Sequence, residues 1–195
     1  MKIKAVIFDM DGTITKPYFD FDAIREEIGL DQNSGPLLEA MQKMTSSERI
    51  NAEKILHYHE QKAIEESQLN NCARETLAAL RTEGIPIGIL TRNTKANAYA
   101  VFNKHGLQFD AVVGREDGPV KPDAFGVLEL CKKFNVQPHE TLVVGDYLFD
   151  LLCAIAAGAV SVLLVNGKKY EFENIANYKI DNIRQVLDII KQGVS

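Results

Sequence analysis

Residues 6–15 read VIFDMDGTIT, an apolar run that ends in two aspartates and a glycine. The segment that leads into them, KAVIFD at 4–9, is apolar and β-branched, with no alternation of polar residues. Such a run is typical of a strand that is covered on both faces, as in a parallel sheet. Asp9 and Asp11 are therefore expected at the carboxyl end of a buried strand, which Gly12 terminates.

The chain beyond this strand changes character twice. Amphipathic helices without an intervening strand are expected over about 17–70, at 20–30, 35–44 and 46–68. Ser46 or Ser47 is the expected N-cap of the third of these helices. From there on, helices and apolar strands alternate. Strands are expected at 85–91, 109–114, 141–146 and 160–167, and helices at 71–84, 95–106, 122–135, 149–158 and 180–192.

The alternation favours an α/β fold, with a Rossmann-like parallel sheet flanked by helices. We interpret the helical block as a small all-helical domain inserted after the first strand. The expected α/β core then comprises residues 1–15 and 72–195, and the expected insertion comprises residues 16–71.

Composition excludes several classes of protein. Apolar residues make up 46% of the 195 residues, which is enough for a real core. The net charge of −5 gives no electrostatic reason to expect nucleic acid or an anionic membrane as a partner. No apolar run approaches the roughly 20 residues of a membrane helix, and the N-terminal segment does not resemble a signal peptide. Three widely spaced cysteines indicate reduced thiols, so a cytoplasmic location is expected.

Polar residues gather at the expected carboxyl ends of the strands, where ligands bind in sheets of this kind. Carboxylates that converge on one spot repel one another unless a cation lies between them. Oxygen ligands favour a hard cation such as Mg²⁺, while a lysine and a hydroxyl suit a phosphoryl group. The residues concerned are Asp9, Asp11, Thr91, Arg92, Asn93, Lys121, Asp146 and Asp150.

The spacing of Asp9 and Asp11 permits a division of labour. Alternate side chains of a strand share a face, so both carboxylates can address one phosphorus atom. Asp9 is the expected nucleophile, which forms an aspartyl-phosphate. Asp11 is the expected acid that protonates the leaving oxygen, and then the base that activates water. Gly12 is expected to allow a tight turn and to present N–H groups to phosphate oxygens.

Four motifs in order, DMDGT at 9–13, TRN at 91–93, VKPD at 120–123 and GDYLFD at 145–150, resemble those of the haloacid dehalogenase-like hydrolase superfamily. The inserted helices look like the cap domain of its phosphoglycolate phosphatase and β-phosphoglucomutase branch. The resemblance implies a Mg²⁺-dependent phosphatase that acts on a small phosphorylated metabolite, of phosphoglycolate or sugar phosphate type. The presence of Asp11 favours phosphoryl chemistry over carbon–halogen cleavage.

The resemblance also implies roles for individual residues. Asp9, Asp11 and Lys121 match the catalytic groups. The Thr91 hydroxyl and the Arg92 amide match phosphate-binding groups, beside Gly12. The metal ligands implied are Asp9, Asp11 through its main-chain carbonyl, Asp146 and Asp150.

Other interpretations stay open at the level of sequence. A mutase of the same branch would return the phosphoryl group to a sugar, and a receiver-like module would carry a phospho-aspartate without turnover. Asp150 equally suits a cap at the start of the following helix. The expected partner is a small phosphomonoester, whose identity the sequence does not reveal, nor does it reveal the oligomeric state.

Overall fold

The computed structural model describes residues 2–193. The chain forms two compact units: residues up to Pro17 belong with those from Gln68 onward, and Tyr18–Ser67 form the second. We call them the core unit and the inserted unit. The divisions expected from the sequence lie after residues 15 and 71, whereas the two units divide after residues 17 and 67.

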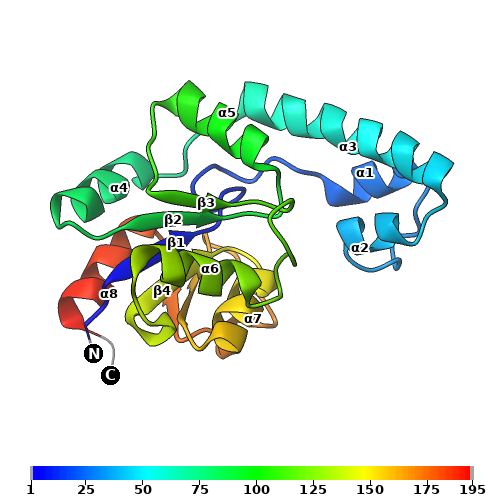
Figure 1. The fold of residues 1–195 in the computed structure, drawn as a ribbon. Coiled ribbons are helices and arrows are strands. Elements are labelled where there is room, and N and C mark those ends of the chain that lie inside the picture. Colours follow the sequence, from blue (N-terminus) through cyan, green and yellow to red (C-terminus); the bar gives the residue numbers. More distant parts are fainter. Residues whose placement is uncertain (1, 194–195) are drawn as a thin grey trace. The chain divides into compact units, whose positions relative to one another are not determined.

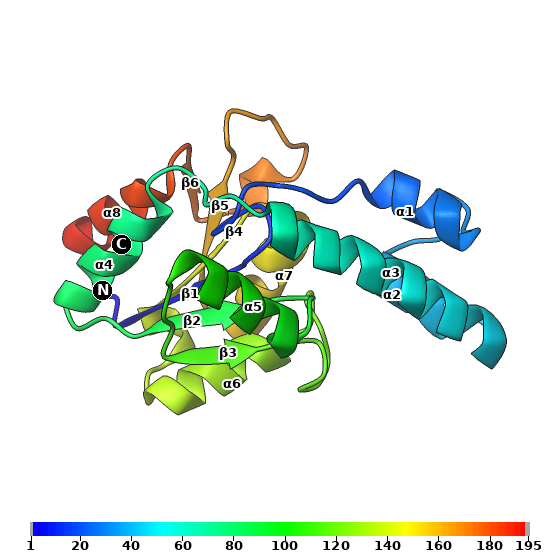
Figure 2. The same ribbon diagram turned by 90° about the horizontal axis from the view of Figure 1, so that it is seen from above.

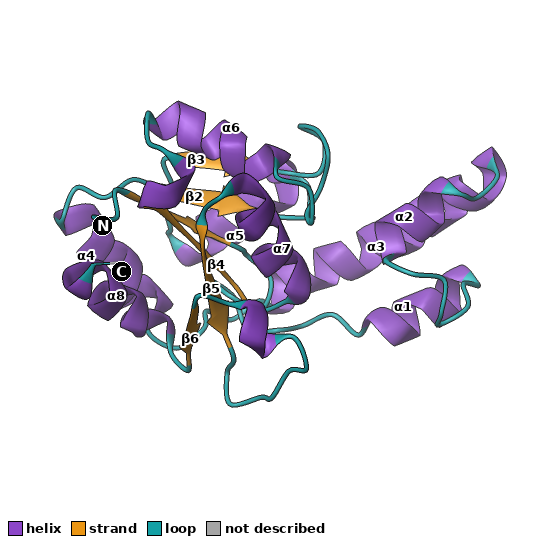
Figure 3. Cartoon of the chain, turned by 90° about the horizontal axis from the view of Figure 1, so that it is seen from below, coloured by secondary structure: helices purple, strands orange, loops and turns teal. Residues whose placement is uncertain are grey.

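The core unit is built on a parallel sheet. Within the described residues the sheet has six strands in the order β3-β2-β1-β4-β5-β6 (Figure 2), and Figure 3 draws these strands in orange between purple helices. The chain thus places β2 on one side of β1 and β4 on the other, which makes the β1–β4 edge a topological switch point. The strands are β1 (Ala5–Phe8), β2 (Ile87–Leu90), β3 (Ala111–Val113), β4 (Thr141–Gly145), β5 (Val160–Leu164) and β6 (Tyr178–Ile180).

Helices cover both faces of this sheet, which explains why β1, β2, β4 and β5 are mostly apolar and are buried along their whole length. Figure 1 shows α6 and α7 on one face and α4 and α5 on the other. The α/β fold expected from the sequence is confirmed. The helices are α4 (Ala73–Thr82), α5 (Lys95–His105), α6 (Phe125–Phe134), α7 (Leu148–Ala157) and α8 (Val186–Gln192), with 3₁₀ turns at Pro138–Glu140, Glu173–Ile175 and Ile183–Gln185.

The sequence pattern did not predict strand β6. Strand β6 pairs with β5 through only three residues, of which Ile180 alone is buried. An edge strand this short carries too few residues for a pattern of burial to stand out from a loop. Among the described residues, no helix combines the length and the apolarity needed to cross a bilayer.

The inserted unit consists of three helices, α1 (Phe21–Ile28), α2 (Leu37–Gln42) and α3 (Ser46–Glu66). Figure 2 shows α1 running alongside α3, and the two helices are in contact. The apolar faces of all three helices enclose a small core within the inserted unit. Its buried members are Ile24, Leu37, Met41, Ala52 and Leu56.

The start of α3 corrects the expectation that Ser46 or Ser47 caps this helix. The N-cap is Thr45, whose hydroxyl accepts a hydrogen bond from the Glu48 amide at 3.4 Å. The Glu48 carboxylate in turn accepts from the Thr45 amide at 2.9 Å, which completes a capping box. The serines were the wrong choice because a capping box requires an acid or amide three residues after the cap, and Glu48 fits that spacing only from Thr45.

Candidate active site

Two neighbouring strands bring the first aspartate of the DMDGT motif next to that of the GDYLFD motif. Asp9 directly follows β1, and Asp146 directly follows β4, with Phe8 of β1 paired to Val144 of β4. Because the strands are parallel, their carboxyl ends lie at the same edge of the sheet. Thr91 follows β2, which pairs with β1 on its other side. The sheet order therefore collects residues from three motifs around one strand end.

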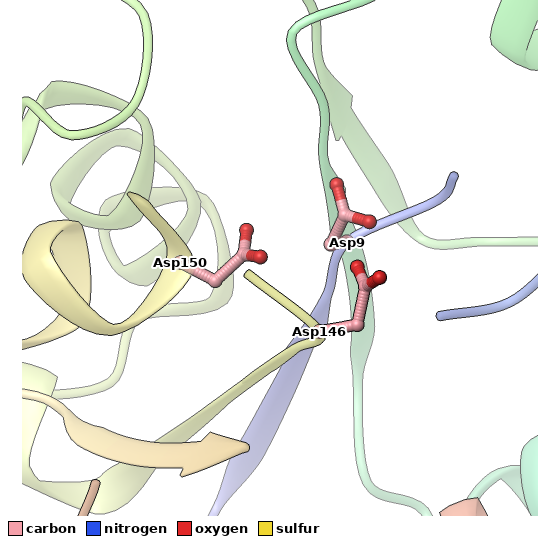
Figure 4. Close-up of side chains that lie close together, drawn as sticks. All are labelled: Asp9, Asp146 and Asp150. Atoms are coloured by element: carbon pink, nitrogen blue, oxygen red, sulfur yellow. The ribbon is translucent and has the colours of Figure 1, made fainter. Parts of the chain in front are cut away.

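Three carboxylates form what we call the acid group: Asp9, Asp146 and Asp150. One oxygen from each lies within 4.8 Å of the other two. Figure 4 shows the three carboxylates turned toward one another, two from strand ends and Asp150 from the first turn of α7. Asp9 and Asp150 are buried, while Asp146 is half-buried. Three like charges this close require either protons or a cation.

The ammonium of Lys121 partly neutralises the negative charge of the acid group. Lys121 lies in the loop before α6 and is only 4% exposed. Its ammonium Nζ donates to Asp9 Oδ1 at 2.5 Å and to Asp150 Oδ1 at 2.6 Å. One positive charge against three carboxylates leaves the site net negative.

The pKa values express this imbalance. Burial raises the pKa of Asp9 to about 6, with the Lys121 ammonium opposing the rise and Asp150 adding to it. Burial raises the pKa of Asp146 to about 8, and the carboxylates of Asp9 and Asp150 add to that rise. Burial alone would lower the pKa of Lys121, but the Asp150 and Asp9 carboxylates outweigh it and hold the pKa above its usual value. The lysine is therefore charged at neutral pH.

Asp150 has the capping role that the sequence left open, together with its place in the acid group. Its Oδ2 accepts a hydrogen bond from the Tyr147 amide at 3.1 Å, at the N-terminus of α7. Its Oδ1 holds Lys121. Both oxygens of this carboxylate thus have protein partners.

The loop after β1 is held by residues that sequence reasoning missed. The side-chain amides of Asn70 and Asn166 both donate to the Gly12 carbonyl, at 3.3 and 3.2 Å. The Thr13 hydroxyl, fully buried, lies 3.4 Å from Asp146 Oδ1. Thr13 is the last residue of the DMDGT motif, so the sequence did offer a signal for it: a short polar residue in a buried segment. The two asparagines lie far away in sequence and carry no local signal.

Gly12 occupies this loop for a steric reason that the sequence did not reveal. Its amide, expected to face phosphate, donates to the Thr15 carbonyl at 3.0 Å. Its φ is +99°, and a Cβ built on it would lie 2.3 Å from Asp146 Oδ2. The glycine thus lets the backbone turn and leaves room for the Asp146 carboxylate.

Replacing Gly12 by alanine is expected to destabilise the core unit beyond the cost of backbone strain. Gly84, at φ +69° with open space around its would-be Cβ, is the matched control. We expect Gly84→Ala to lower the free energy of unfolding by about 1 kcal/mol. Gly12→Ala should cost roughly 1–3 kcal/mol more, because Asp146 must move. Urea unfolding of both variants measures the difference, and equal losses would contradict the steric argument.

The remaining expected residues lie around the acid group in different ways. Thr91 is buried, and its hydroxyl accepts from the Asn93 amide at 3.0 Å, which leaves its proton for another acceptor. The Arg92 guanidinium donates to the Lys121 carbonyl. Asp11 is half-buried and bridges to Thr15 through the main chain. Its carboxylate is not part of the acid group found within residues 2–193.

Similarity to known proteins identifies the family of this chain. The family model of the haloacid dehalogenase-like hydrolases matches residues 3–158. An uncharacterized hydrolase of Saccharomyces cerevisiae is 32% identical, over 97% of this chain and 91% of that protein. A phosphoglycolate phosphatase of Chromobacterium violaceum is 26% identical, over 98% of each chain. The solved structure of a hydrolase from Pseudomonas syringae shares the fold, with a TM-score of 0.80 at 22% identity over 98% of this chain and 100% of that one. The chain belongs to the haloacid dehalogenase-like hydrolases.

Proposed function

We propose that this protein is a Mg²⁺-dependent phosphatase that hydrolyses a small phosphomonoester through an aspartyl-phosphate on Asp9. The observation that carries the proposal is the meeting of three carboxylates and one buried lysine at the carboxyl edge of the sheet. Family membership and the similarity to a phosphoglycolate phosphatase support phosphoryl chemistry on a small metabolite.

The acid group suits a hard divalent cation. Its donors are all carboxylate oxygens, which Mg²⁺ prefers, whereas zinc and copper favour nitrogen and sulfur ligands. The raised pKa values of Asp9 and Asp146 reflect burial and mutual repulsion, which a divalent charge would relieve. We assign Asp9, Asp146 and the Asp11 carbonyl as direct ligands. Since both oxygens of Asp150 already have partners, we assign it a contact through water. Bound there, the ion would neutralise charge on the phosphoryl oxygens.

In the first half-reaction, a carboxylate oxygen of Asp9 attacks phosphorus and the bond from phosphorus to the leaving oxygen breaks. Asp11 donates its proton to that oxygen, so the product leaves as a neutral alcohol. The pKa of Asp9, about 6, leaves its carboxylate ionised at neutral pH, as a nucleophile requires. The product of this step is an aspartyl-phosphate on Asp9 and an ionised Asp11.

In the second half-reaction, Asp11 takes a proton from water, whose oxygen attacks the same phosphorus. The bond from phosphorus to Asp9 breaks, which releases inorganic phosphate and restores the Asp9 carboxylate. The Thr91 hydroxyl, the Arg92 amide and the Lys121 ammonium are assigned to the phosphoryl oxygens throughout. Two of the three donor hydrogens of Lys121 are used by carboxylates, and the third is assigned to the substrate.

The inserted unit is assigned the role of a cap that selects the leaving group and excludes water.

A reducing compartment such as the cytoplasm is the proposed location. The three cysteines, Cys72, Cys131 and Cys153, are all free, and two of them are buried. Burial raises the pKa of Cys153 to about 12, which keeps this thiol protonated.

Phosphate release from p-nitrophenyl phosphate tests the proposal directly. We expect turnover with MgCl₂ and none after treatment with EDTA. A panel of phosphoglycolate, sugar phosphates and mononucleotides then ranks substrates by kcat/KM. Absence of turnover on every phosphoester with Mg²⁺ present would overturn the proposal in favour of a receiver-like module. Activation by a sugar bisphosphate with little phosphate release would indicate a mutase.

A further inference from the structure

The side chain of Arg92 joins three segments that surround the acid group. Its Nη1 donates to the main-chain carbonyl of Lys121, in the loop before α6. Its guanidinium carbon lies 5.0 Å from the centre of the Phe149 ring, in the first turn of α7. Arg92 itself follows Thr91 after β2. The Arg92 guanidinium thus contacts the backbone of Lys121 and the side chain of Phe149, the residue before Asp150.

Lys121 needs such support because no helix or strand holds it. The segment from Gly114 to Ala124 consists of turns and bends between β3 and α6. Yet the ammonium must lie between Asp9 and Asp150, at 2.5 and 2.6 Å. A shift of about 1 Å in such a group can cost about 10²-fold in rate. The backbone position of Lys121 is therefore a determinant of the proposed chemistry.

We infer that Arg92 is a positioning residue, whose guanidinium lies over the Phe149 ring, holds the Lys121 carbonyl and thereby sets the Lys121 ammonium between Asp9 and Asp150. The inference rests on the proposed phosphatase function. Arginine suits this task because its planar group can stack on a ring while its N–H groups point outward to a carbonyl. A lysine at position 92 would offer a flexible point charge without that geometry.

The rival role for Arg92 is direct contact with phosphate, which guanidinium groups often bind. The two roles differ in their dependence on Lys121. A positioning residue acts through the lysine, so its loss costs nothing further once the lysine is gone. A direct phosphate ligand acts on its own, so its loss multiplies with that of the lysine.

The test is a double-mutant cycle on Arg92→Ala and Lys121→Met, read as kcat and KM for p-nitrophenyl phosphate with Mg²⁺. We expect Arg92→Ala to lower kcat/KM by about 10- to 100-fold. The double variant should match Lys121→Met within about 3-fold. Losses that multiply, or an Arg92→Ala variant as active as wild type, would overturn the inference.

Three additions keep this test decisive. If Lys121→Met has no measurable turnover, calorimetric binding of inorganic phosphate with Mg²⁺ provides the same cycle. If Arg92→Ala does not fold, Phe149→Leu removes the stacking ring and should lower kcat/KM in the wild-type background but not in Lys121→Met. Arg184→Ala, which removes an exposed arginine of the 3₁₀ turn before α8, is the matched control and should leave activity unchanged.

Failure of this inference is separable from failure of the proposed function. A wild-type protein without phosphatase activity, or a Lys121→Met variant that equals wild type, would refute the function. An active wild type, impaired by Lys121→Met and insensitive to Arg92→Ala, would refute the role of Arg92 alone.

Discussion

Replacing Asp9 by asparagine will lower phosphate release by at least about 10³-fold, because the amide cannot attack phosphorus. The change keeps the shape of the side chain and an oxygen for the Lys121 ammonium, which lies 2.5 Å from Asp9 Oδ1. It also removes one acid from a crowded group of three. The fold is therefore expected to survive, with a melting temperature close to that of the wild type.

Intact-protein mass spectrometry after rapid quenching measures the covalent step itself. The wild type should show a fraction of molecules heavier by one phosphoryl group during turnover, and Asp9→Asn should show none. Asp181→Asn, at an exposed position in the core unit, controls for loss of an acid and should retain both activity and the adduct. An Asp9→Asn protein that turns over normally, or that still carries the phosphoryl group, would refute the nucleophile assignment.

Replacing Asp146 by asparagine will raise the Mg²⁺ concentration for half-maximal activity by at least about 10-fold, the scale of loss when a metal site is weakened. Asp146 contributes charge to the proposed site from the end of β4. Its carboxylate lies with those of Asp9 and Asp150, and burial with their repulsion raises its pKa to about 8. Asparagine removes a ligand that would ionise when a cation binds. It costs the metal-free protein little, because a carboxyl group with a pKa of about 8 is mostly protonated at neutral pH.

Thermal melting with and without MgCl₂ separates the two effects without relying on activity. The wild type should gain melting temperature on adding Mg²⁺, because a ligand that binds only the folded state stabilises it. The Asp146→Asn variant should gain much less, and in EDTA it should melt no lower than the wild type. An unchanged Mg²⁺ titration in the variant would contradict the assignment of Asp146 as a ligand.

The sequence predicted the α/β fold because the buried strands β1, β2, β4 and β5 consist mostly of apolar residues. It also indicated the superfamily, which the family comparison confirms over residues 3–158. It missed β6, whose three residues carry no periodicity, and it misplaced the cap of α3 by one or two residues. These errors arise where an element is short or where two adjacent residues both suit a cap.

In the active site, too, local motifs predicted some features and the tertiary structure alone decided others. The motifs indicated which carboxylates would lie at strand ends, and parallel strands made their meeting at one edge foreseeable. The second role of Asp150, as a cap that also holds Lys121, was open until the two oxygens were located. The partners of Gly12, Asn70 and Asn166, were not foreseeable, since they lie 58 and 154 residues from it.

Chain-local chemistry was thus sufficient for most strands and helices and for the types of group at the active edge, but not for β6 or the cap of α3. A run of apolar side chains, or an acid one residue from another, depends only on covalent neighbours. The pairing of Lys121 with Asp9 across 112 residues, and the Arg92 contact that holds the lysine loop, arose only once the sheet had assembled. Such contacts depend on the order of the strands and on how loops of irregular structure pack over them, which no repeating pattern along the chain records.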